Sequence, residues 1–244
     1  MIKFFRTIRQ RLLAENRFSR YLLYAIGEIV LVVVGILLAL QINTSSQNSQ
    51  NRAKEIKYLE SFKHDLESDI VELERVIEKS TRVSQRADSL LMYLTSAEID
   101  FSIKYDRYVF SLTGFTIYLS QEGTVQDIIG SGNLNLITND SVRLKLVTWD
   151  ADLKNLREWE LLGKATAGAH FEYIRTHFDY YKGGRGESIL KESDVLAMKS
   201  DLVFLNTVAM RSQECAKLAS LYQEELARTQ NILSILETEL GEID

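Results

Sequence analysis

Glu28 is the only charged residue in an apolar stretch that runs from Tyr21 to Ile42. A carboxylate at the centre of a membrane helix costs about 2.5–3.5 kcal/mol on insertion scales. Glu28 lies near the basic end of the stretch, so we expect a smaller cost there. The carboxylate could contact a partner helix, bond to Arg20 or to lipid headgroups at interfacial depth, or couple an ion. We favour the partner contact, because lipid does not stabilise an isolated carboxylate.

Small residues lie close to Glu28 along the same stretch. Gly27 precedes it, and Gly35 and Ala39 follow with the small-xxx-small spacing that lets two membrane helices approach closely. The sequence therefore predicts an intramembrane contact made by Gly27, Glu28, Gly35 and Ala39. The partner would be another membrane protein or a second copy of this chain.

Two histidines and the single cysteine are further candidates for chemistry, but their spacing indicates structural roles. His170 and His177 are seven residues apart, about 10 Å along a helix axis, a spacing that zinc sites do not favour. Cys215 falls on an apolar seam, where we expect a buried and unreactive thiol. The glycines of residues 183–186 match neither nucleotide-binding pattern and predict a turn. We therefore expect no catalytic residue, no metal and no cofactor, and a protein that is not an enzyme.

The stretch from Tyr21 to Ile42 predicts a helix that crosses a membrane. As a helix it would be about 33 Å long, enough for a hydrocarbon core of about 30 Å. A cleaved signal peptide is the main alternative. However, a long basic arm precedes the stretch, and Ala39-Leu40-Gln41 is a poor cleavage site. We therefore favour an uncleaved anchor, with the lipid bilayer as its first partner.

The residues before this helix carry a strong positive charge, whereas the chain from Arg52 onward has 23 basic and 32 acidic residues. By the positive-inside rule the N-terminus is cytoplasmic, which places the body in the periplasm of a bacterium, anchored to the inner membrane. The arm could also lie on an anionic membrane surface as a basic amphipathic helix, or serve only as a topology signal. The predicted membrane-surface residues are Lys3, Arg6, Arg9, Arg11, Arg17 and Arg20. The acidic body argues against nucleic-acid binding.

The chain beyond the membrane stretch predicts long helices, because it contains no proline and repeats apolar residues at helical spacing. We predict an all-α protein in which one transmembrane helix is followed by an antiparallel helical bundle of long amphipathic helices. Polar residues interrupt the apolar repeat within residues 52–94, which favours a bundle over a long, tight coiled coil. The predicted segments are a cytoplasmic arm at 1–20, the transmembrane helix at 21–42, a linker at 43–51 and a periplasmic helical domain at 52–244. The long helices of that domain are expected at 52–94, at 141–181 and from Ser193 or later to Leu240.

Residues 95–138 are the least regular part of the chain. Aromatic and β-branched residues within 105–119 are typical of strands, but no other segment offers a partner strand, so we expect helix and loop. The glycines of residues 130–132 predict a helix end. Asn139 or Asp140 is the predicted N-cap of the next helix.

The opening MIKFFRTIRQRLLAENRFSRYLLYAIGEIVLVVVGILLALQIN closely resembles the N-terminus of a family of uncharacterised single-pass membrane proteins of Bacteroidota, classed as a domain of unknown function. The later stretch IIGSGNLNLITNDSVRLKL is similar to that family's SGNLNLI region. One departure follows QIN, where relatives tend to have an Asn-Trp-Asn-Glu-like stretch and this chain has TSSQN. The resemblance implies a bacterial inner-membrane setting and carries over no activity.

Three functional hypotheses follow from these features. The first is a membrane-anchored periplasmic helical bundle that acts by protein–protein or ligand interaction, in some cases as a homo-oligomer. The second is an accessory subunit of a membrane transport or ion-coupled complex, contacted through Glu28. The third is a sensor, which would need a separate cytoplasmic effector because the cytoplasmic arm is short. We favour the first.

Overall fold

The computed structural model describes residues 18–183, 185 and 189–241, and the chain divides into two compact units, Met1–Glu55 and Ile56–Asp244. The described residues form helices joined by turns and loops, with no strand among them, which confirms the all-α prediction. The elements are α2 (Phe18–Thr95), α3 (Tyr105–Ser111), α4 (Gly123–Gly130), the 3₁₀ helix η1 (Asn133–Leu136), α5 (Asp140–His177), α6 (Tyr180–Gly183), α7 (Glu192–Ser200) and α8 (Leu202–Gly241).

The first unit contains the apolar part of α2. Its large side chains from Leu22 to Ile42 are exposed along the helix. The stretch is long and apolar enough to cross a membrane, and none of its most apolar window is buried within the described residues. α2 is therefore a candidate membrane span, as the sequence predicts.

The predicted linker at residues 43–51 is wrong as secondary structure, because α2 continues through it as helix. The stretch contains neither glycine nor proline, the two residues that most weaken a helix interior. Its polar side chains also pair at helical spacing. The amide nitrogen of Gln47 donates to Asn51 Oδ1 at 3.0 Å, and that of Gln50 donates to Ser46 Oγ at 3.5 Å. Low hydrophobicity alone was a poor indicator of a break in the helix.

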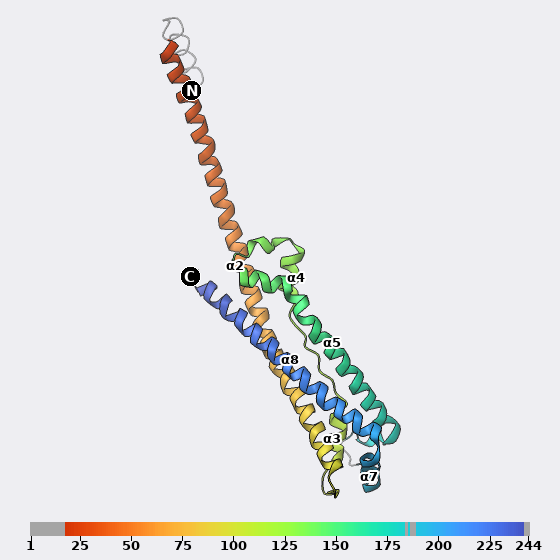
Figure 1. The fold of residues 1–244 in the computed structure, drawn as a ribbon. Helices are drawn as coiled ribbons and strands as arrows, with labels where there is room; N and C mark the ends of the chain where they lie inside the picture. The colour runs from red at the N-terminus through yellow and green to blue at the C-terminus, as the bar shows by residue number, and fades with distance from the viewer. Residues whose placement is uncertain (1–17, 184, 186–188, 242–244) are drawn as a thin grey trace. The chain divides into compact units, whose positions relative to one another are not determined.

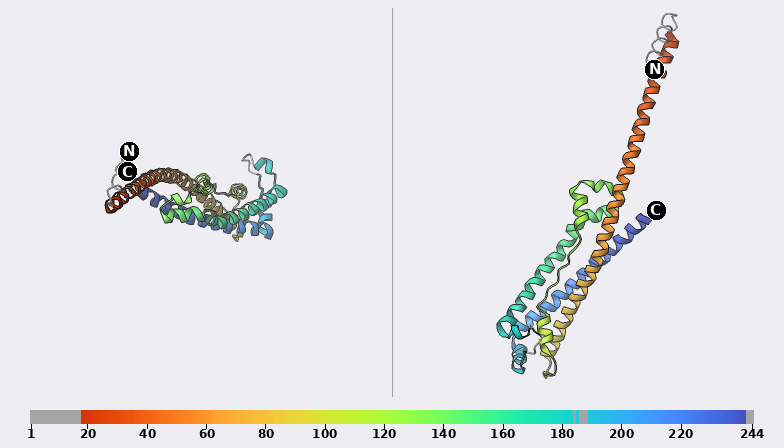
Figure 2. Two further views of the ribbon diagram at one scale, coloured as in Figure 1. Left: turned by 90° about the horizontal axis from the view of Figure 1, so that it is seen from above. Right: turned by 180° about the vertical axis from the view of Figure 1, so that it is seen from behind.

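The second unit is a bundle in which the later part of α2, α5 and α8 are the long helices (Figure 1). α8 runs opposite to the other two, but α2 and α5 run in the same direction (Figures 1 and 2). The bundle is therefore not antiparallel throughout, which corrects the prediction. The reason is the connection between α3 and α4, residues 112–122, called the extended segment below: after a turn at 112–113 it carries the chain back along the bundle.

Two clusters of buried apolar side chains hold the bundle together. One includes Leu73 of α2 and Leu153 of α5, together with residues of α4 and α8. The other includes Leu90 of α2, Ile174 of α5 and Phe204 of α8, together with residues of α3 and α7. Burial of a large aliphatic or aromatic side chain contributes about 1.5–3 kcal/mol, so the two clusters are the main source of stability.

The predicted helix boundaries in the middle of the chain are confirmed. Asn139 is the N-cap of α5, where its side-chain oxygen accepts the N–H groups of Ser141 at 3.0 Å and Val142 at 3.2 Å. α4 ends at Gly130, and Gly132 takes a left-handed conformation with φ of 71°. A glycine adopts that conformation without the strain that a Cβ would cause.

The C-terminal part of the chain has two helix breaks that the sequence did not predict. α5 ends at His177 and the short α6 follows, in place of one helix to residue 181. The last predicted helix is divided into α7 and α8 at Asp201. The Asp201 carboxylate accepts the N–H groups of Val203 at 2.8 Å and Phe204 at 3.1 Å, so this residue starts α8 as an N-cap.

Candidate functional site

The residues predicted to make an intramembrane contact lie exposed on α2. Glu28, Gly35 and Ala39 have the spacing of a single helix face, and Gly27 lies beside that face. A Cβ added at Gly27 or Gly35 would meet no atom within 4 Å. Among the described residues none forms a hydrogen bond or ion pair with the Glu28 carboxylate. The structure thus leaves this face open within the chain.

The predicted membrane-surface residues are not described by the structure. Lys3, Arg6, Arg9, Arg11 and Arg17 lie outside the described residues, and Arg20 lies in α2 with a side chain that is not described. The amphipathic arm stays a prediction.

The two histidines have separate and structural surroundings. His170 is fully buried, with Nε2 2.8 Å from the Val109 carbonyl oxygen, and burial lowers its pKa to about 4. His177 is exposed and stacks on the Tyr173 ring at 4.1 Å between centroids. The part of the chain that the structure describes contains no group of three or more His, Cys, Asp or Glu residues able to hold a metal ion.

Cys215 is buried, as predicted. Burial raises the pKa of its thiol to about 12, with a further increase from Glu214 and an opposing effect of Arg211. A thiol in this state stays protonated near neutral pH and is a poor nucleophile.

Side chains of the surrounding helices hold the extended segment, residues 112–122, in place. Its side chains alternate as they would in a strand: Thr116 and Tyr118 are buried, whereas Phe115, Ile117 and Leu119 are exposed. An extended backbone normally satisfies its N–H and C=O groups by pairing with another strand. Here the partners are side chains of the surrounding helices, and they occupy both edges of the segment.

Side chains of α2 bind one edge of the extended segment. Lys79 Nζ donates to the carbonyl oxygen of Phe115 at 3.0 Å. The N–H of Gln121 donates to Asp69 Oδ1 at 2.8 Å, and nearby the N–H of Thr124 donates to Asp65 Oδ2 at 3.3 Å. The positions on α2 fall as those on the segment rise, so the two run in opposite directions.

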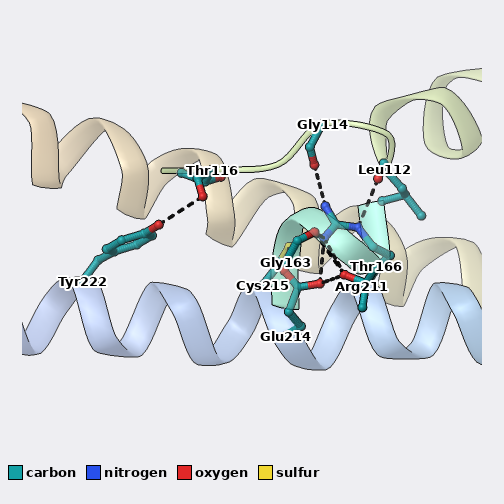
Figure 3. Close-up of polar contacts among 9 residues, drawn as sticks. All are labelled: Leu112, Gly114, Thr116, Gly163, Thr166, Arg211, Glu214, Cys215 and Tyr222. Atoms are coloured by element: carbon teal, nitrogen blue, oxygen red, sulfur yellow. Dashed lines mark hydrogen bonds and ion pairs between the residues drawn. The ribbon is translucent and has the colours of Figure 1, made fainter. Parts of the chain in front are cut away.

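Side chains of α5 and α8 bind the other edge. The N–H of Tyr118 donates to Glu160 Oε1 at 2.7 Å. The hydroxyl of Tyr222 lies 2.9 Å from the same Glu160 oxygen. It also lies 3.4 Å from the carbonyl oxygen of Thr116 (Figure 3). Alternate residues of the segment therefore direct their backbone groups to opposite sides, as in a strand, and each side has its own helices as partners.

Arg211 of α8 anchors the start of the segment (Figure 3). Its Nε donates to the Leu112 carbonyl oxygen at 3.1 Å, and its Nη2 donates to that of Gly114 at 2.5 Å. Its Nη1 lies 2.7 Å from Glu214 Oε2 and also donates to Thr166 Oγ1 and to the Gly163 carbonyl oxygen, both at 3.2 Å. A fully buried guanidinium is tolerated because it has an ion partner and an acceptor for each nitrogen.

Gly163 of α5 makes this arrangement sterically possible. A Cβ at this position would lie 2.5 Å from Glu214 Oε1 and 3.2 Å from a methyl carbon of Leu218. α5 and α8 are thus close enough here for a backbone carbonyl of one helix to reach the arginine of the other. Any larger residue at 163 would displace the Glu214 carboxylate.

The carboxylates that hold the segment are affected by their burial. Burial raises the pKa of Asp69 to about 6, although the N–H of Gln121 and the hydroxyl of Tyr118 oppose the shift. Burial also raises the pKa of Glu160, against the opposing bonds from Tyr118 and Tyr222. Both carboxylates therefore accept hydrogen bonds at a cost in desolvation. Both carboxylates act as hydrogen-bond acceptors for backbone N–H groups.

The sequence interpretation missed these buried charges, although a local signal existed. Arg211 follows Val208 by three residues and precedes Cys215 by four, so it lies on the buried face of α8. Asp69 has the same relation to Leu66 and Leu73 on α2, and Glu160 follows the buried Leu156 of α5 by four residues. A charged residue at a seam position is the pattern that would have found them. Their partners, which lie on the extended segment, could not be read from the pattern.

Comparison with known protein families gives a match over the first part of the chain. Residues 28–154 match a family of unknown function, DUF6090, and this range includes Glu28, the extended segment and the SGNLNLI stretch. Comparisons with curated proteins and with solved structures find no match. Because the matched range covers more than half of the 244 residues, the chain belongs to the DUF6090 family of unknown function.

Proposed function

We propose that the protein is anchored in the bacterial inner membrane by α2 and acts by binding, with residues 56–244 as a periplasmic bundle that contacts another protein or a ligand. The observation that carries this proposal is the exposure of the apolar side chains from Leu22 to Ile42. A continuous apolar surface of this length requires a cover, and a lipid bilayer provides one without any other chain. The basic residues before it and the acidic body after it support a cytoplasmic N-terminus.

Fusions at the C-terminus test the anchoring and the orientation. Alkaline phosphatase, which becomes active only in the periplasm, should be active when fused to the full chain. Green fluorescent protein, which does not fluoresce after export through the general secretion pathway, should be dark. The full chain should stay with the membrane fraction after a carbonate wash, and a variant without residues 1–43 should not. A fluorescent, phosphatase-inactive fusion or a full chain released by carbonate would contradict the proposal.

A second candidate function, accessory subunit of a membrane complex, is favoured by Glu28. Its carboxylate is exposed on an apolar helix, next to small residues that would let a partner helix approach. A carboxylate in that setting is stabilised by a hydrogen-bond donor on another helix. The partner is either a larger membrane protein or a second copy of this chain.

Co-purification in a mild detergent tests this candidate. We expect a membrane partner, or a differently tagged copy of the chain, to be recovered with the wild type and lost with Glu28→Gln. Glu74→Gln is the matched control, because Glu74 is an exposed glutamate of α2 within the second unit. Identical recoveries with the wild type and both variants would reject the role of Glu28 and leave the bundle as the binding unit.

A further inference from the structure

A pocket lined by arginines lies between α2 and α3, away from the residues that hold the extended segment. Its volume is about 540 Å³, and its walls are Arg82, Gln85, Arg86 and Ser89 of α2 with Arg107 and Tyr108 of α3. The four α2 residues have the spacing of one helix face, so all of them point toward the same space. The volume falls within the range of about 300–1,000 Å³ that is typical of small-molecule sites.

Two of the three guanidinium groups have no counter-ion among the residues that the structure describes. Arg82 forms an ion pair with Glu78. Among the described residues, no carboxylate lies within ion-pair distance of Arg86 or Arg107. The nearest acidic residue in sequence to Arg107 is Asp106, whose carboxylate instead accepts the N–H groups of residues 189 and 190.

This concentration of positive charge is unusual for the unit that contains it. From Arg52 onward the chain has more acidic than basic residues, so a solvated surface would on average place carboxylates near each arginine. The guanidinium groups of Arg86 and Arg107, which have no ion pair among the described residues, repel each other, and the repulsion is relieved when an anion binds between them. The arrangement therefore favours an anionic ligand over an empty pocket.

The helix backbones that carry the pocket residues are held in place by the core. Tyr105 and Val109, which flank the pocket residues of α3, are buried in the same apolar cluster as Leu90 of α2. The Tyr108 ring packs edge-on against Tyr93 of α2, with 5.4 Å between centroids. The backbone of the site is therefore formed before a ligand binds, so the conformational entropy lost on binding is that of the side chains.

We propose that this pocket binds a phosphoryl group carried by a larger molecule, either a soluble phosphate ester or a phospholipid headgroup. Guanidinium forks match the oxygens of a phosphoryl group through paired, charge-assisted hydrogen bonds. The Gln85 amide adds an uncharged donor at the same wall, whereas the Ser89 hydroxyl donates to the Gln85 carbonyl oxygen at 2.8 Å and keeps only acceptor capacity. The pocket is larger than a phosphate ion needs, and the Tyr108 ring offers a surface for the organic part of the ligand. Binding here does not depend on the compartment in which the bundle lies.

Titration of glycerol phosphate onto the full chain in nanodiscs of neutral phosphatidylcholine tests the site. Isothermal titration calorimetry at constant ionic strength should give saturable binding. Arg86→Gln and Arg107→Gln should each weaken binding, and the double variant should weaken it by about tenfold or more, because each substitution removes a positive charge and its charge-assisted hydrogen bonds. Arg175→Gln is the matched control, since Arg175 is exposed, is paired with Glu172 and does not line the pocket.

A second arm identifies the source of the phosphoryl group. Nanodiscs that contain phosphatidic acid should weaken glycerol phosphate binding if a lipid headgroup reaches the pocket, and should leave it unchanged if the ligand is soluble; either result keeps the site. Circular dichroism must show the same melting temperature for the double variant and the wild type without ligand, because the substituted side chains are at the surface. Absence of saturable binding to the wild type up to about 10 mM, or equal binding by the double variant, would overturn the proposal.

Discussion

The guanidinium of Arg211 is fully buried, and its three nitrogens donate to three carbonyl oxygens, the Thr166 hydroxyl and the Glu214 carboxylate. Removal of the arginine would leave Glu214 as a buried charge without its ion partner and would remove the side-chain donor of the Leu112 and Gly114 carbonyl groups. Breaking a buried pair in this way is far more harmful than replacing both members with apolar groups. Arg211 therefore stabilises the fold by pairing with groups that would otherwise be buried without a partner.

We predict that Arg211→Met lowers the free energy of unfolding by about 3–5 kcal/mol, because Glu214 is left buried and unpaired. The double variant Arg211→Met with Glu214→Met should recover part of that loss. Urea denaturation followed by far-ultraviolet circular dichroism measures both. Arg175→Met, at an exposed arginine of α5, is the control and should change stability by no more than about 0.5 kcal/mol. A single variant as stable as this control would show that the buried pair does not stabilise the fold.

At the scale of elements, the extended segment explains the course of the chain. It has the composition of a strand but no strand beside it, and the helices supply donors and acceptors from long polar side chains. Because helix side chains take the place of a neighbouring strand, the segment can return along the bundle, and α2 and α5 run in the same direction. The exposed residues Phe115, Ile117 and Leu119 then face outward, because the alternation of an extended chain requires it.

Substitution of Glu160 tests how the segment is held. Glu160→Gln keeps an oxygen that can accept from the Tyr118 N–H and the Tyr222 hydroxyl, and it removes a charge whose burial is unfavourable. Glu160→Leu leaves the Tyr118 N–H without its acceptor and leaves the Tyr222 hydroxyl with only the Thr116 carbonyl oxygen at 3.4 Å. We predict that the free energy of unfolding of the leucine variant is about 1–3 kcal/mol lower than that of the glutamine variant at neutral pH. Chemical denaturation compares them, and equal stability would mean that the segment does not depend on this side chain.

At the scale of the whole molecule, two buried titratable groups act on stability in opposite directions with pH. His170 packs against the cluster that contains Ile174 and Phe204, and Asp69 lies on the face of α2 that contributes Leu73 to the other cluster. Burial lowers the pKa of His170 from 6.5 to about 4 and raises that of Asp69 from 3.8 to about 6. In each case the folded state favours the uncharged form.

The sign of each effect follows from which state takes up the proton. Between pH 6.5 and about 4 the unfolded chain protonates His170 and the folded chain does not, so acid removes up to about 3 kcal/mol of stability. Over much of the same range the folded chain protonates Asp69 and the unfolded chain does not. The contribution of Asp69 is therefore present at low pH and is lost as pH rises through about 6.

We predict that the melting temperature of His170→Gln falls less than that of the wild type between pH 6.5 and 4.5, and that the melting temperature of Asp69→Asn falls more. Differential scanning calorimetry at matched ionic strength gives the three profiles. The glutamine can still donate to the Val109 carbonyl oxygen, so the comparison isolates the titration. Parallel profiles for the wild type and the two variants would show that neither group is buried as the structure describes.

Much of the local architecture was predictable from the amino-acid sequence. The helical conformation of the apolar stretch up to Ile42, the all-α class, the helix start at Asn139 or Asp140 and the burial of the Cys215 thiol were predicted correctly. These features depend on residues close together in the chain. Hydrophobic spacing reports which face of a helix is buried, and a cap is made by a side chain within three residues of the groups that it satisfies.

The path of residues 112–122, the shared direction of α2 and α5, and the burial of Arg211 and Glu160 became visible only with all the helices in place. Each depends on contacts between residues 40 or more positions apart, such as Tyr118 with Glu160 or Leu112 with Arg211. A charged residue at a seam position can equally end a buried face or fill a polar site within it. The free energy of burying it depends on the acceptors and donors that distant segments bring to it, and no local pattern contains that information.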